Sequence, residues 1–383
     1  MLHNSNKETI LKEEIQENTL AIYLEDEQIN YIPEKDSGYT LDTEKSSCTS
    51  GVTIGFDYNT WSVKTNFQNY INTDTSRVKC NLYFKKVPLA TEYILSLADS
   101  SDELVYDETT DNNLRYIGAD PNNYVSFNNE LWRIIGVMNN IDDGTGKVET
   151  RLKIIRDEPI GNFSWDYDSV GSFSNDWSTS ALMNLLNNGA YYNRTMGSYY
   201  NNSTTATNVD FTSIGLTNEA KSMISDAVWN LGGLSISELE SNYYYNVNTS
   251  LWYEYERGTI VKTEELTTWT GQIGLMYPSS YGYATNGGNI GRNECLEKPL
   301  AIWDNYDDCY KNSWLFDSSG TQWTINSVSS NNISAYYVFS GGFVGFFTTN
   351  REDALVAPTV YLSSNVKIID GIGTKEDPFL LAL

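Results

Sequence analysis

The residue types that most often perform catalysis are sparse or poorly arranged in this sequence. Its single histidine, His3, excludes histidine-dependent triads and most histidine-ligated metal sites. Serine and cysteine nucleophiles therefore lack a histidine base, and no G-x-S-x-G elbow occurs. The 50 Asp and Glu residues supply many carboxylates, but no spacing selects a pair suited to glycoside hydrolysis. We therefore assign no catalytic residue and expect that the protein is not an enzyme.

Acidic side chains are the remaining candidates for a metal site. Asp304, Asp307 and Asp308 lie close together in the sequence, and calcium prefers carboxylate oxygens. A calcium site needs about six to eight oxygen ligands, and the sequence shows no EF-hand spacing. We interpret the cluster as solvated loop charge and expect neither a metal ion nor a cofactor. The formal net charge of −25 also repels nucleic acids and anionic membranes.

The four cysteines form two pairs that are close in sequence, Cys48 with Cys80 and Cys295 with Cys309. No C-x-x-C motif occurs, which argues against zinc binding and thioredoxin-like redox chemistry. We expect two disulfides, and with them an oxidising location outside the cell or on its surface. Each bridge would stabilise the fold by roughly 3–4 kcal/mol in the chain-entropy model. The alternative is a cytosolic protein with four reduced, buried thiols.

Aromatic residues are concentrated in one stretch near the C-terminus, where they favour a function in binding. The runs 335–339 and 343–347 flank Ser340-Gly341-Gly342, which is a β-hairpin signal. The hairpin carries more aromatic surface than it can easily bury, and Asn, Ser and Thr residues accompany the rings, a composition suited to recognition. Strand alternation should still turn about half of the rings inward. The residues that we expect to bind a ligand are Asn331, Ile333, Tyr337, Phe339, Phe343, Phe346, Phe347, Asn350 and Arg351.

The elements that must position this hairpin divide the chain into three parts. Residues 1–19 are charged and carry few apolar positions, which indicates a polar leader or stalk. Residues 20–88 contain short β-prone runs separated by turn residues. We expect them to form a small β-sandwich-like domain, clamped by Cys48 and Cys80 and ended by Pro88. Residues 89–383 combine strands, helices and long loops, so the expected fold class is α+β.

Several elements are predicted within residues 89–383. The apolar runs 131–137 and 150–157 flank a DDGTG turn and indicate a hairpin. Apolar stripes at helical spacing predict three helices. These are 91–98 with Thr91 as cap, 177–187 with Ser178 as cap, and 216–231 with Thr217 as cap. Long loops, one closed by Cys295 and Cys309, then lead to the aromatic hairpin, and loops of this kind often carry function.

Several longer motifs resemble a known protein family. They are YTLDTEKSSC at 39–48, RYIGADPNNYVSFNNELWRIIGV at 115–137, WTGQIGLMYPSSYGYAT at 269–285, the Cys295–Cys309 pair with SWLF, and APTVYLSSNVKI at 357–368 with GTKEDPF. These motifs are similar to a family of Gram-positive bacterial surface proteins, over roughly residues 39–383. The resemblance implies that residues 89–383 form a C-type lectin-like domain. That fold is shared with formylglycine-generating enzymes and with variable proteins of diversity-generating retroelements.

The resemblance also implies ligand recognition by the C-terminal domain and an N-terminal membrane anchor or pilin-like leader, although no run of 18 apolar residues occurs here. The catalytic cysteines of formylglycine-generating enzymes have no counterpart, since all four cysteines are assigned to bridges. In the retroelement proteins, variable positions arise from mutated adenines, often in Asn codons. Between Asn331 and Ala354 only Glu352 is a residue type that such mutation cannot produce. A diversified surface and a fixed hairpin both fit this pattern.

Taken together, these features predict a secreted or cell-surface protein that binds a protein or glycan ligand in recognition or adhesion. The main alternative is a structural, pilin-like or surface-layer subunit whose aromatic patch is buried against a neighbouring subunit. A glycosidase-type enzyme is the third hypothesis. No nucleic-acid partner is expected.

Overall fold

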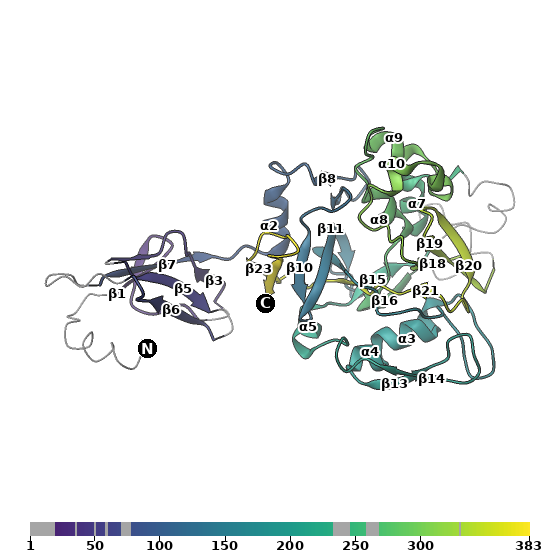
Figure 1. The fold of residues 1–383 in the computed structure, drawn as a ribbon, viewed down its shortest axis with the longest axis horizontal. Coiled ribbons are helices and arrows are strands. Elements are labelled where there is room, and N and C mark those ends of the chain that lie inside the picture. The colour runs from purple at the N-terminus through teal and green to yellow at the C-terminus, as the bar shows by residue number, and fades with distance from the viewer. Residues whose placement is uncertain are drawn as a thin grey trace. The chain divides into compact units, whose positions relative to one another are not determined.

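The computed structural model describes residues 20–34, 37–49, 51–57, 60–69, 78–232, 246–257, 268–328 and 331–383 of the chain. The predicted leader at residues 1–19 lies outside the described residues. The chain divides into two compact units, residues 1–88 and 89–383 (Figure 1). Pro88, which ends the strand-rich segment of the sequence, is the last residue of the first unit. Helices and strands both occur, which confirms the α+β class.

The described part of the first unit consists of β-strands. Its five-stranded sheet has the order β2-β1-β7-β3, and β4 also pairs with β7. A separate hairpin, β5 with β6, packs apolar side chains against the core of this sheet, so the unit has two layers. The strands are β1 (Leu20–Leu24), β2 (Glu27–Ile29), β3 (Tyr39–Leu41), β4 (Ser47–Cys48), β5 (Thr53–Asp57), β6 (Ser62–Asn66) and β7 (Cys80–Lys86).

A disulfide joins two strands of this first sheet. Cys48 on β4 and Cys80 on β7 are direct partners in the antiparallel register, and their sulfur atoms are bonded. The bridge was expected from the sequence and is confirmed. It closes a segment with a sequence separation of 32 residues, beside a core made of Ile22, Leu41, Leu82 and Phe84.

The second unit is organised on a nine-stranded sheet of order β17-β22-β12-β11-β10-β24-β23, to which β9 and β8 are added through β11. The antiparallel pair β11 and β12 lies at its centre and confirms the predicted hairpin. Its turn is held by Asp142, whose Oδ1 accepts a hydrogen bond from the Gly144 amide at 2.7 Å. The strands are β8 (Leu104–Tyr106), β9 (Leu114–Tyr116), β10 (Tyr124–Phe127), β11 (Glu130–Asp142), β12 (Val148–Arg156), β17 (Ile273–Gly274), β22 (Thr359–Tyr361), β23 (Lys367–Asp370) and β24 (Phe379–Ala382).

Smaller sheets and short helices complete the second unit. The strands that carry the aromatic hairpin form a four-stranded sheet of order β20-β19-β18-β21. Strands β13 and β14 form a further hairpin, and β15 pairs with β16, which follows helix α7 in the chain. These strands are β13 (Met196–Tyr199), β14 (Thr207–Asp210), β15 (Ala227–Asn230), β16 (Thr268–Gly271), β18 (Thr321–Ser327), β19 (Ser334–Val338), β20 (Val344–Thr348) and β21 (Ala354–Leu355). The helices are α2 (Ala90–Leu97), η1 (Trp177–Thr179), α3 (Ala181–Asn187), α4 (Ala190–Asn193), α5 (Asn218–Met223), α7 (Thr249–Glu256), α8 (Pro278–Tyr283), α9 (Arg292–Glu297), η3 (Leu300–Asn305) and α10 (Asp307–Tyr310).

The predicted helix at 216–231 is wrong beyond its first turns. Thr217 does cap a helix, because its hydroxyl accepts a hydrogen bond from the Ala220 amide at 3.1 Å. That helix, α5, ends at Met223, and Ala227–Asn230 form strand β15 instead. Strand β15 pairs with β16, some 40 residues further along the chain, and Trp229 stands opposite Trp269. The apolar stripe therefore contains strand residues whose partners lie far away in sequence.

Two other helices are confirmed, but their caps differ from the prediction. The first begins at Ala90, and the Glu92 carboxylate accepts from the amide of its N-cap, Leu89, at 3.0 Å, so Thr91 is not the cap. The second is confirmed only as α3, which Ser180 caps by accepting from the Met183 amide at 3.1 Å. Trp177–Thr179 form the separate 3-10 helix η1 with Asp176 as its N-cap, so Ser178 is not the cap. Among the described residues, no helix has the length and apolar character needed to cross a membrane.

Candidate functional site

The aromatic hairpin forms as predicted and lies at the edge of its sheet. Strands β19 and β20 pair antiparallel, and β20 is the terminal strand in the sheet order (Figure 1). The turn between them is closed by a hydrogen bond of 2.8 Å from the Phe339 amide to the Phe343 carbonyl. Gly342 adopts a φ of +96°, which favours glycine at this point of the turn.

Strand alternation sorts the aromatic side chains of the hairpin onto two faces. Phe343, Gly345 and Phe347 share one face of β20, and Tyr337 stands opposite Gly345 on β19. A Cβ at Gly345 would lie only 3.1 Å from the Tyr337 hydroxyl and 3.2 Å from Phe343 Cε2, so two rings pack directly over this glycine. Phe346 belongs to the opposite face, where its ring meets Tyr336 edge-on with centroids 6.2 Å apart.

The first of these faces carries a row of three rings, and the Arg351 guanidinium lies between this row and Phe347. Ring centroids are 6.2 Å apart for Tyr337 and Phe339 and 4.9 Å apart for Phe339 and Phe343. The Arg351 guanidinium carbon lies 4.9 Å from the Phe347 ring centroid and 5.8 Å from that of Tyr337. We call this set the aromatic strip: Tyr337, Phe339, Phe343, Phe347 and Arg351. The Asp353 carboxylate accepts from Arg351 Nη2 at 2.9 Å, and this ion pair together with the two rings holds the guanidinium in place before any ligand arrives.

Solvent exposure separates the predicted binding residues into three groups. Phe347 is 47% exposed, and Phe346 and Ile333 are each 37% exposed. The half-buried group is Asn331, Phe339, Phe343, Asn350 and Arg351. Tyr337 is only 7% exposed, which corrects its assignment as a surface residue. Its ring is covered from within by Trp323, with centroids 6.1 Å apart, because Tyr337 lies on the inner strand β19.

Two of the predicted asparagines are engaged in loop structure. The Asn331 Oδ1 accepts hydrogen bonds from the amides of Ile333 at 2.9 Å and Ser334 at 2.8 Å, which fixes the loop that presents Ile333. The Asn350 Nδ2 donates to the Asn202 Oδ1 at 3.0 Å. Asn331 therefore acts first as a turn residue, while the exposed apolar groups beside it supply contact area.

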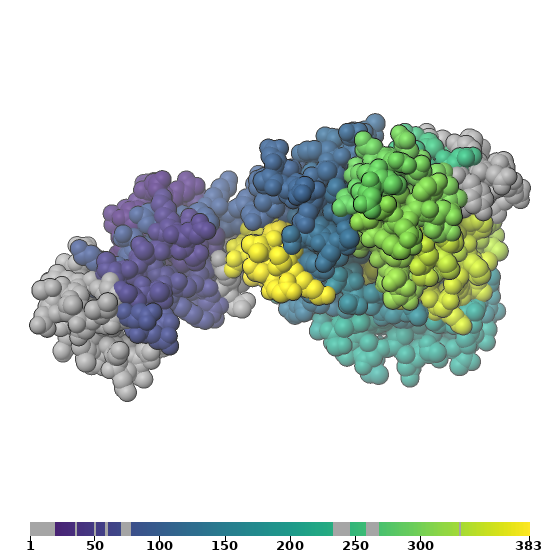
Figure 2. Space-filling model, turned by 45° about the horizontal axis from the view of Figure 1, so that its top comes forward, coloured from purple at the N-terminus to yellow at the C-terminus, as the bar shows by residue number. Residues whose placement is uncertain are grey.

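The second disulfide supports the turn of the hairpin. Cys295 and Cys309 are bonded, as predicted, and join α9 to α10. Tyr310 follows directly and packs so closely on the turn that a Cβ at Gly342 would lie 2.4 Å from its Cγ. The Tyr281 hydroxyl donates to the Gly342 carbonyl at 2.8 Å. In Figure 2 the green region that includes α9 and α10 adjoins the yellow-green hairpin, so the bridged segment and the hairpin share one surface.

A second cluster, buried near the central sheet, was not found by sequence reasoning. Lys153 on β12 is 1% exposed, and its Nζ lies 3.9 Å from the Tyr277 ring centroid and 4.9 Å from those of Trp229 and Tyr361. No described residue forms a hydrogen bond with this amine. Burial lowers the pKa of Lys153 well below its usual value, and the nearby Arg115 acts in the same direction.

Glu256 on α7 lines the same small cavity as Lys153, which has a volume of about 20 Å³. Burial raises the pKa of Glu256 to about 7, although Ser279 donates hydrogen bonds to it from its amide, at 2.8 Å, and from its hydroxyl. A cavity of this volume holds about one water molecule. Lys153 and Glu256 thus lie in a polar part of the core, where burial moves the pKa of each away from its ordinary value.

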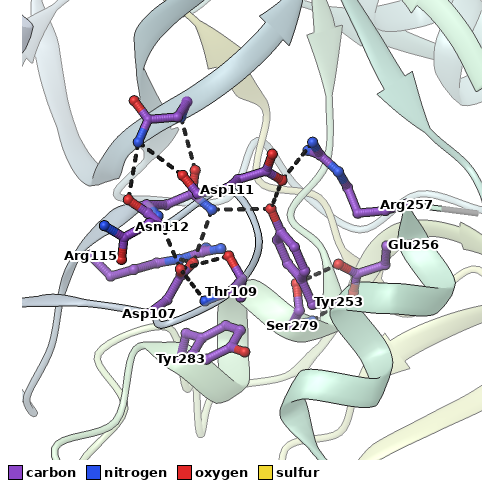
Figure 3. A network of polar contacts seen from close by, with 12 residues as sticks. Asp107, Thr109, Asp111, Asn112, Arg115, Tyr253, Glu256, Arg257, Ser279 and Tyr283 are labelled. Atoms are coloured by element: carbon purple, nitrogen blue, oxygen red, sulfur yellow. Dashed lines mark hydrogen bonds and ion pairs between the residues drawn. The ribbon is translucent and has the colours of Figure 1, made fainter. Parts of the chain in front are cut away.

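An ordered polar network adjoins this cluster (Figure 3). Asp107 accepts from Arg115 Nε at 2.8 Å and from Asn113 Nδ2 at 2.9 Å. Burial opposes the ionisation of Asp107, but Arg115 and the hydrogen bonds outweigh it and hold the pKa below its ordinary value. Asp111 accepts from the Tyr253 hydroxyl and forms an ion pair with Arg257 at 2.6 Å. Asp107 and its partners lie within nine residues of one another, whereas Asp111 is joined to Tyr253 and Arg257, which are distant in sequence.

The acidic loop residues considered for calcium do not gather into a metal centre. Asp307 pairs with Lys311 at 2.6 Å, and Asp308 accepts from Asn289 Nδ2 at 3.0 Å. Across the described part of the chain, no group of three or more His, Cys, Asp or Glu side chains is placed to hold a metal ion.

Comparisons with known proteins found no relative: no family model matches the chain, and neither a curated protein nor a solved structure does so.

Proposed function

We propose that this protein is a binding protein that recognises its partner through the exposed part of the aromatic hairpin. The observation that carries the proposal is the edge strand β20, which exposes Phe347 on one face and Phe346 on the other. Large exposed apolar groups that gather on one element are typical of interaction surfaces, whereas single exposed residues are ordinary. Arg351, which lies over Phe347 and is paired with Asp353, adds a polar group beside Phe347.

The contact energy available from these rings is substantial. A Phe side chain has about 150–250 Å² of surface, so a ring that is half exposed leaves about 100 Å² to bury. At roughly 25 cal/mol per Å², each such ring contributes about 2 kcal/mol to a complex. Aromatic and Arg side chains are the usual energetic centres of interfaces, and their partly fixed positions limit the entropy lost on binding.

The disulfides and the motifs of the sequence support a proposal for where the protein is located and which class of ligand it binds. Two disulfides are typical of proteins in an oxidising compartment, which supports a secreted or cell-surface location. Within that setting the ligand is a protein or a glycan presented on another surface, and the second unit serves as a C-type lectin-like recognition domain of the Gram-positive surface-protein type. We keep variation of the hairpin by a retroelement as part of this proposal, to be tested by sequencing neighbouring genes for a reverse transcriptase.

The test begins with a search for the ligand and uses matched variants. Wild-type protein is applied to a glycan array and to intact cells, beside the variant Phe346→Ala/Phe347→Ala/Arg351→Ala. The control is Leu95→Ala/Val170→Ala/Ile372→Ala, which removes three apolar side chains that are also exposed but lie elsewhere in the second unit. We expect binding to be lost in the first variant and kept in the control. Equal binding by both variants would count against the hairpin as the contact surface.

The same surface would also serve an assembly subunit, since an edge strand can pair with another chain. Light scattering at increasing concentration separates the two functions. A monomer over the whole range supports binding of a different partner. Self-association that the hairpin variant abolishes and the control retains supports assembly.

A further inference from the structure

The small cavity that Lys153 and Glu256 share has walls with more positive than negative charge. Its lining comes from segments that are distant in sequence, among them strands β9, β12 and β22 and helices α7 and α8. The described charged residues of the wall are three cations, Arg115, Lys153 and Arg257, and one carboxylate, Glu256. The aspartates that pair with the two arginines are not among the described lining residues. The balance of charge in the wall therefore favours a negatively charged occupant.

Two buried donors in this cavity are without a partner. The Lys153 amine belongs to a residue that is 1% exposed, and it forms no hydrogen bond with a described residue. The Ser280 hydroxyl, on a residue that is also 1% exposed, likewise has no hydrogen-bond partner in the described part of the chain. Buried polar groups usually have a partner. Because both side chains line the same cavity, one occupant can satisfy both donors.

The carboxylate in the wall is directed towards other donors. Ser279 donates to Glu256 from its amide, at 2.8 Å, and from its hydroxyl, and Figure 3 shows the two side chains facing each other. Burial raises the pKa of Glu256 to about 7, so the carboxyl group is uncharged in mildly acidic solution. Under those conditions Glu256 does not repel an anion.

The size of the cavity limits its occupant to a single small group. A volume of about 20 Å³ holds about one water molecule, whereas carboxylate and phosphate groups contain at least three heavy atoms. Water would leave the buried ammonium charge without an opposite charge, and a buried charge is stable when it is paired. A halide ion has the required size and charge and only accepts hydrogen bonds, so it matches the two donors.

We propose that this cavity binds one chloride ion, which is held by the Lys153 ammonium and the Ser280 hydroxyl. The ion pairs a charge that burial otherwise disfavours, and it joins strand β12 to helix α8. Helix α8 also supports the turn of the aromatic hairpin, because the Tyr281 hydroxyl donates to the Gly342 carbonyl. The site is separate from the aromatic strip and does not depend on the function proposed for the hairpin.

Thermal unfolding of the whole chain in sodium chloride tests this site, with sodium gluconate as the replacement at constant ionic strength. Gluconate is too large for the cavity. We expect the melting temperature of the wild type to rise by about 2–4 °C between zero and about 0.5 M chloride. Lys153→Met should show no rise, whereas Lys375→Met, which removes a charge from a side chain that is 57% exposed, should respond like the wild type. Equal rises in all three proteins would show a general salt effect and overturn the proposal, as would a wild type that does not respond.

The pH dependence of the chloride effect follows from the groups that face the ion. As pH rises, Lys153 loses its charge and Glu256 gains one, so chloride should stabilise the wild type less at about pH 8.5 than at about pH 5.5. Burial raises the pKa of the three tyrosines in the wall, so they stay uncharged in this range. The other titratable or charged groups of the wall are Arg115, Arg257 and these tyrosines, Tyr253, Tyr277 and Tyr361. A larger effect of chloride at pH 8.5 would contradict the site.

Ser280→Ala provides an independent test, since it removes one hydroxyl and leaves the net charge unchanged. We expect the chloride concentration that gives half of the stabilisation to rise about tenfold, because a hydrogen bond to a charged group is lost. An unchanged concentration would place the ion elsewhere and refute the site. Crystals grown in sodium bromide locate the ion directly. An anomalous scattering peak between Lys153 and Ser280 is the expected result, and a cavity that holds only water would overturn the proposal.

Discussion

Replacing Lys153 by methionine should stabilise the protein at neutral pH. The amine is fully buried among the rings of Trp229, Tyr277 and Tyr361 and has no hydrogen-bond partner among the described residues. Methionine has a similar length, is flexible, and makes favourable contacts with aromatic rings. Because exchange of a buried charge for an apolar side chain is often stabilising by about 1–4 kcal/mol, we expect a gain of that order at pH 7.

The pH dependence of this gain distinguishes its cause. Burial lowers the pKa of Lys153 in the folded protein, so below the ordinary pKa of 10.5 the unfolded chain binds more protons at this site. The wild type therefore gains stability as pH rises, by up to about 1.4 kcal/mol per pH unit, and methionine has no such slope. The advantage of Lys153→Met should shrink from pH 7 towards pH 10. The other titratable or charged groups around the cavity are Arg115, Glu256, Arg257 and the three tyrosines Tyr253, Tyr277 and Tyr361.

Urea unfolding followed by near-ultraviolet circular dichroism measures this effect. Trp61 is the only tryptophan of residues 1–88, so the tryptophan signal reports mainly on the second unit. Lys375→Met is the control, since its side chain is 57% exposed and should change the free energy of unfolding by less than about 0.5 kcal/mol. A Lys153→Met protein that is less stable than the wild type by a constant amount at every pH would refute the reasoning. It would show instead that the rings hold a charged ammonium.

Three further predictions follow from the described contacts. In the wild type, the folded state keeps the Glu256 proton between pH 4.5 and 7, so the free energy of unfolding should fall by up to about 3 kcal/mol as pH rises through this range. Glu256→Gln should remove this fall, which urea unfolding curves recorded at several pH values measure. An equal fall in the variant would be contrary evidence. Replacing Cys295 and Cys309 by alanine should cost about 3 kcal/mol, measured by urea unfolding, and a loss below about 0.5 kcal/mol would argue against a constraining bridge. Gly345→Ala should displace the Phe343 ring and weaken ligand binding with little change in fold, and unaltered affinity would show that the strip is not the contact surface.

The sequence predicts local elements well where their partners are close in the chain. The hairpin of β11 and β12 and that of β19 and β20 were both expected, because apolar runs flank a short turn in each case. Both disulfides were expected for a similar reason, since the cysteines of each pair are near neighbours in sequence. These features can therefore be predicted from short stretches of sequence, without knowledge of the fold.

Long-range contacts explain what the sequence did not predict. The stripe after Met223 matches helical spacing, yet Val228 and Trp229 pair with residues of β16 that lie some 40 positions away. The polar cluster combines Lys153 on β12 with Glu256 on α7 and aromatic side chains from three other segments. Neither residue stands out in its own neighbourhood, because the shifts in pKa come mainly from burial, which depends on the whole fold.

The candidate site shows the same division between local and long-range information. Alternation along β20 predicts that Phe343 and Phe347 share a face, and the structure shows that they do. Alternation cannot tell which face is covered, and Tyr337 is buried because Trp323 packs behind it. The exposed pair Phe346 and Phe347 is likewise a consequence of the edge position of β20, which depends on the order of strands in the sheet.

The most direct test of the central proposal is the affinity of the hairpin variant for the first ligand found by array or cell binding. Phe346→Ala/Phe347→Ala/Arg351→Ala and the control Leu95→Ala/Val170→Ala/Ile372→Ala are compared with the wild type by surface plasmon resonance. Loss of two half-exposed rings and a stacked cation predicts that the dissociation constant rises by about a hundredfold or more in the first variant. The control should stay within about threefold of the wild type. Equal affinities for all three proteins would contradict the assignment of the aromatic hairpin as the recognition surface.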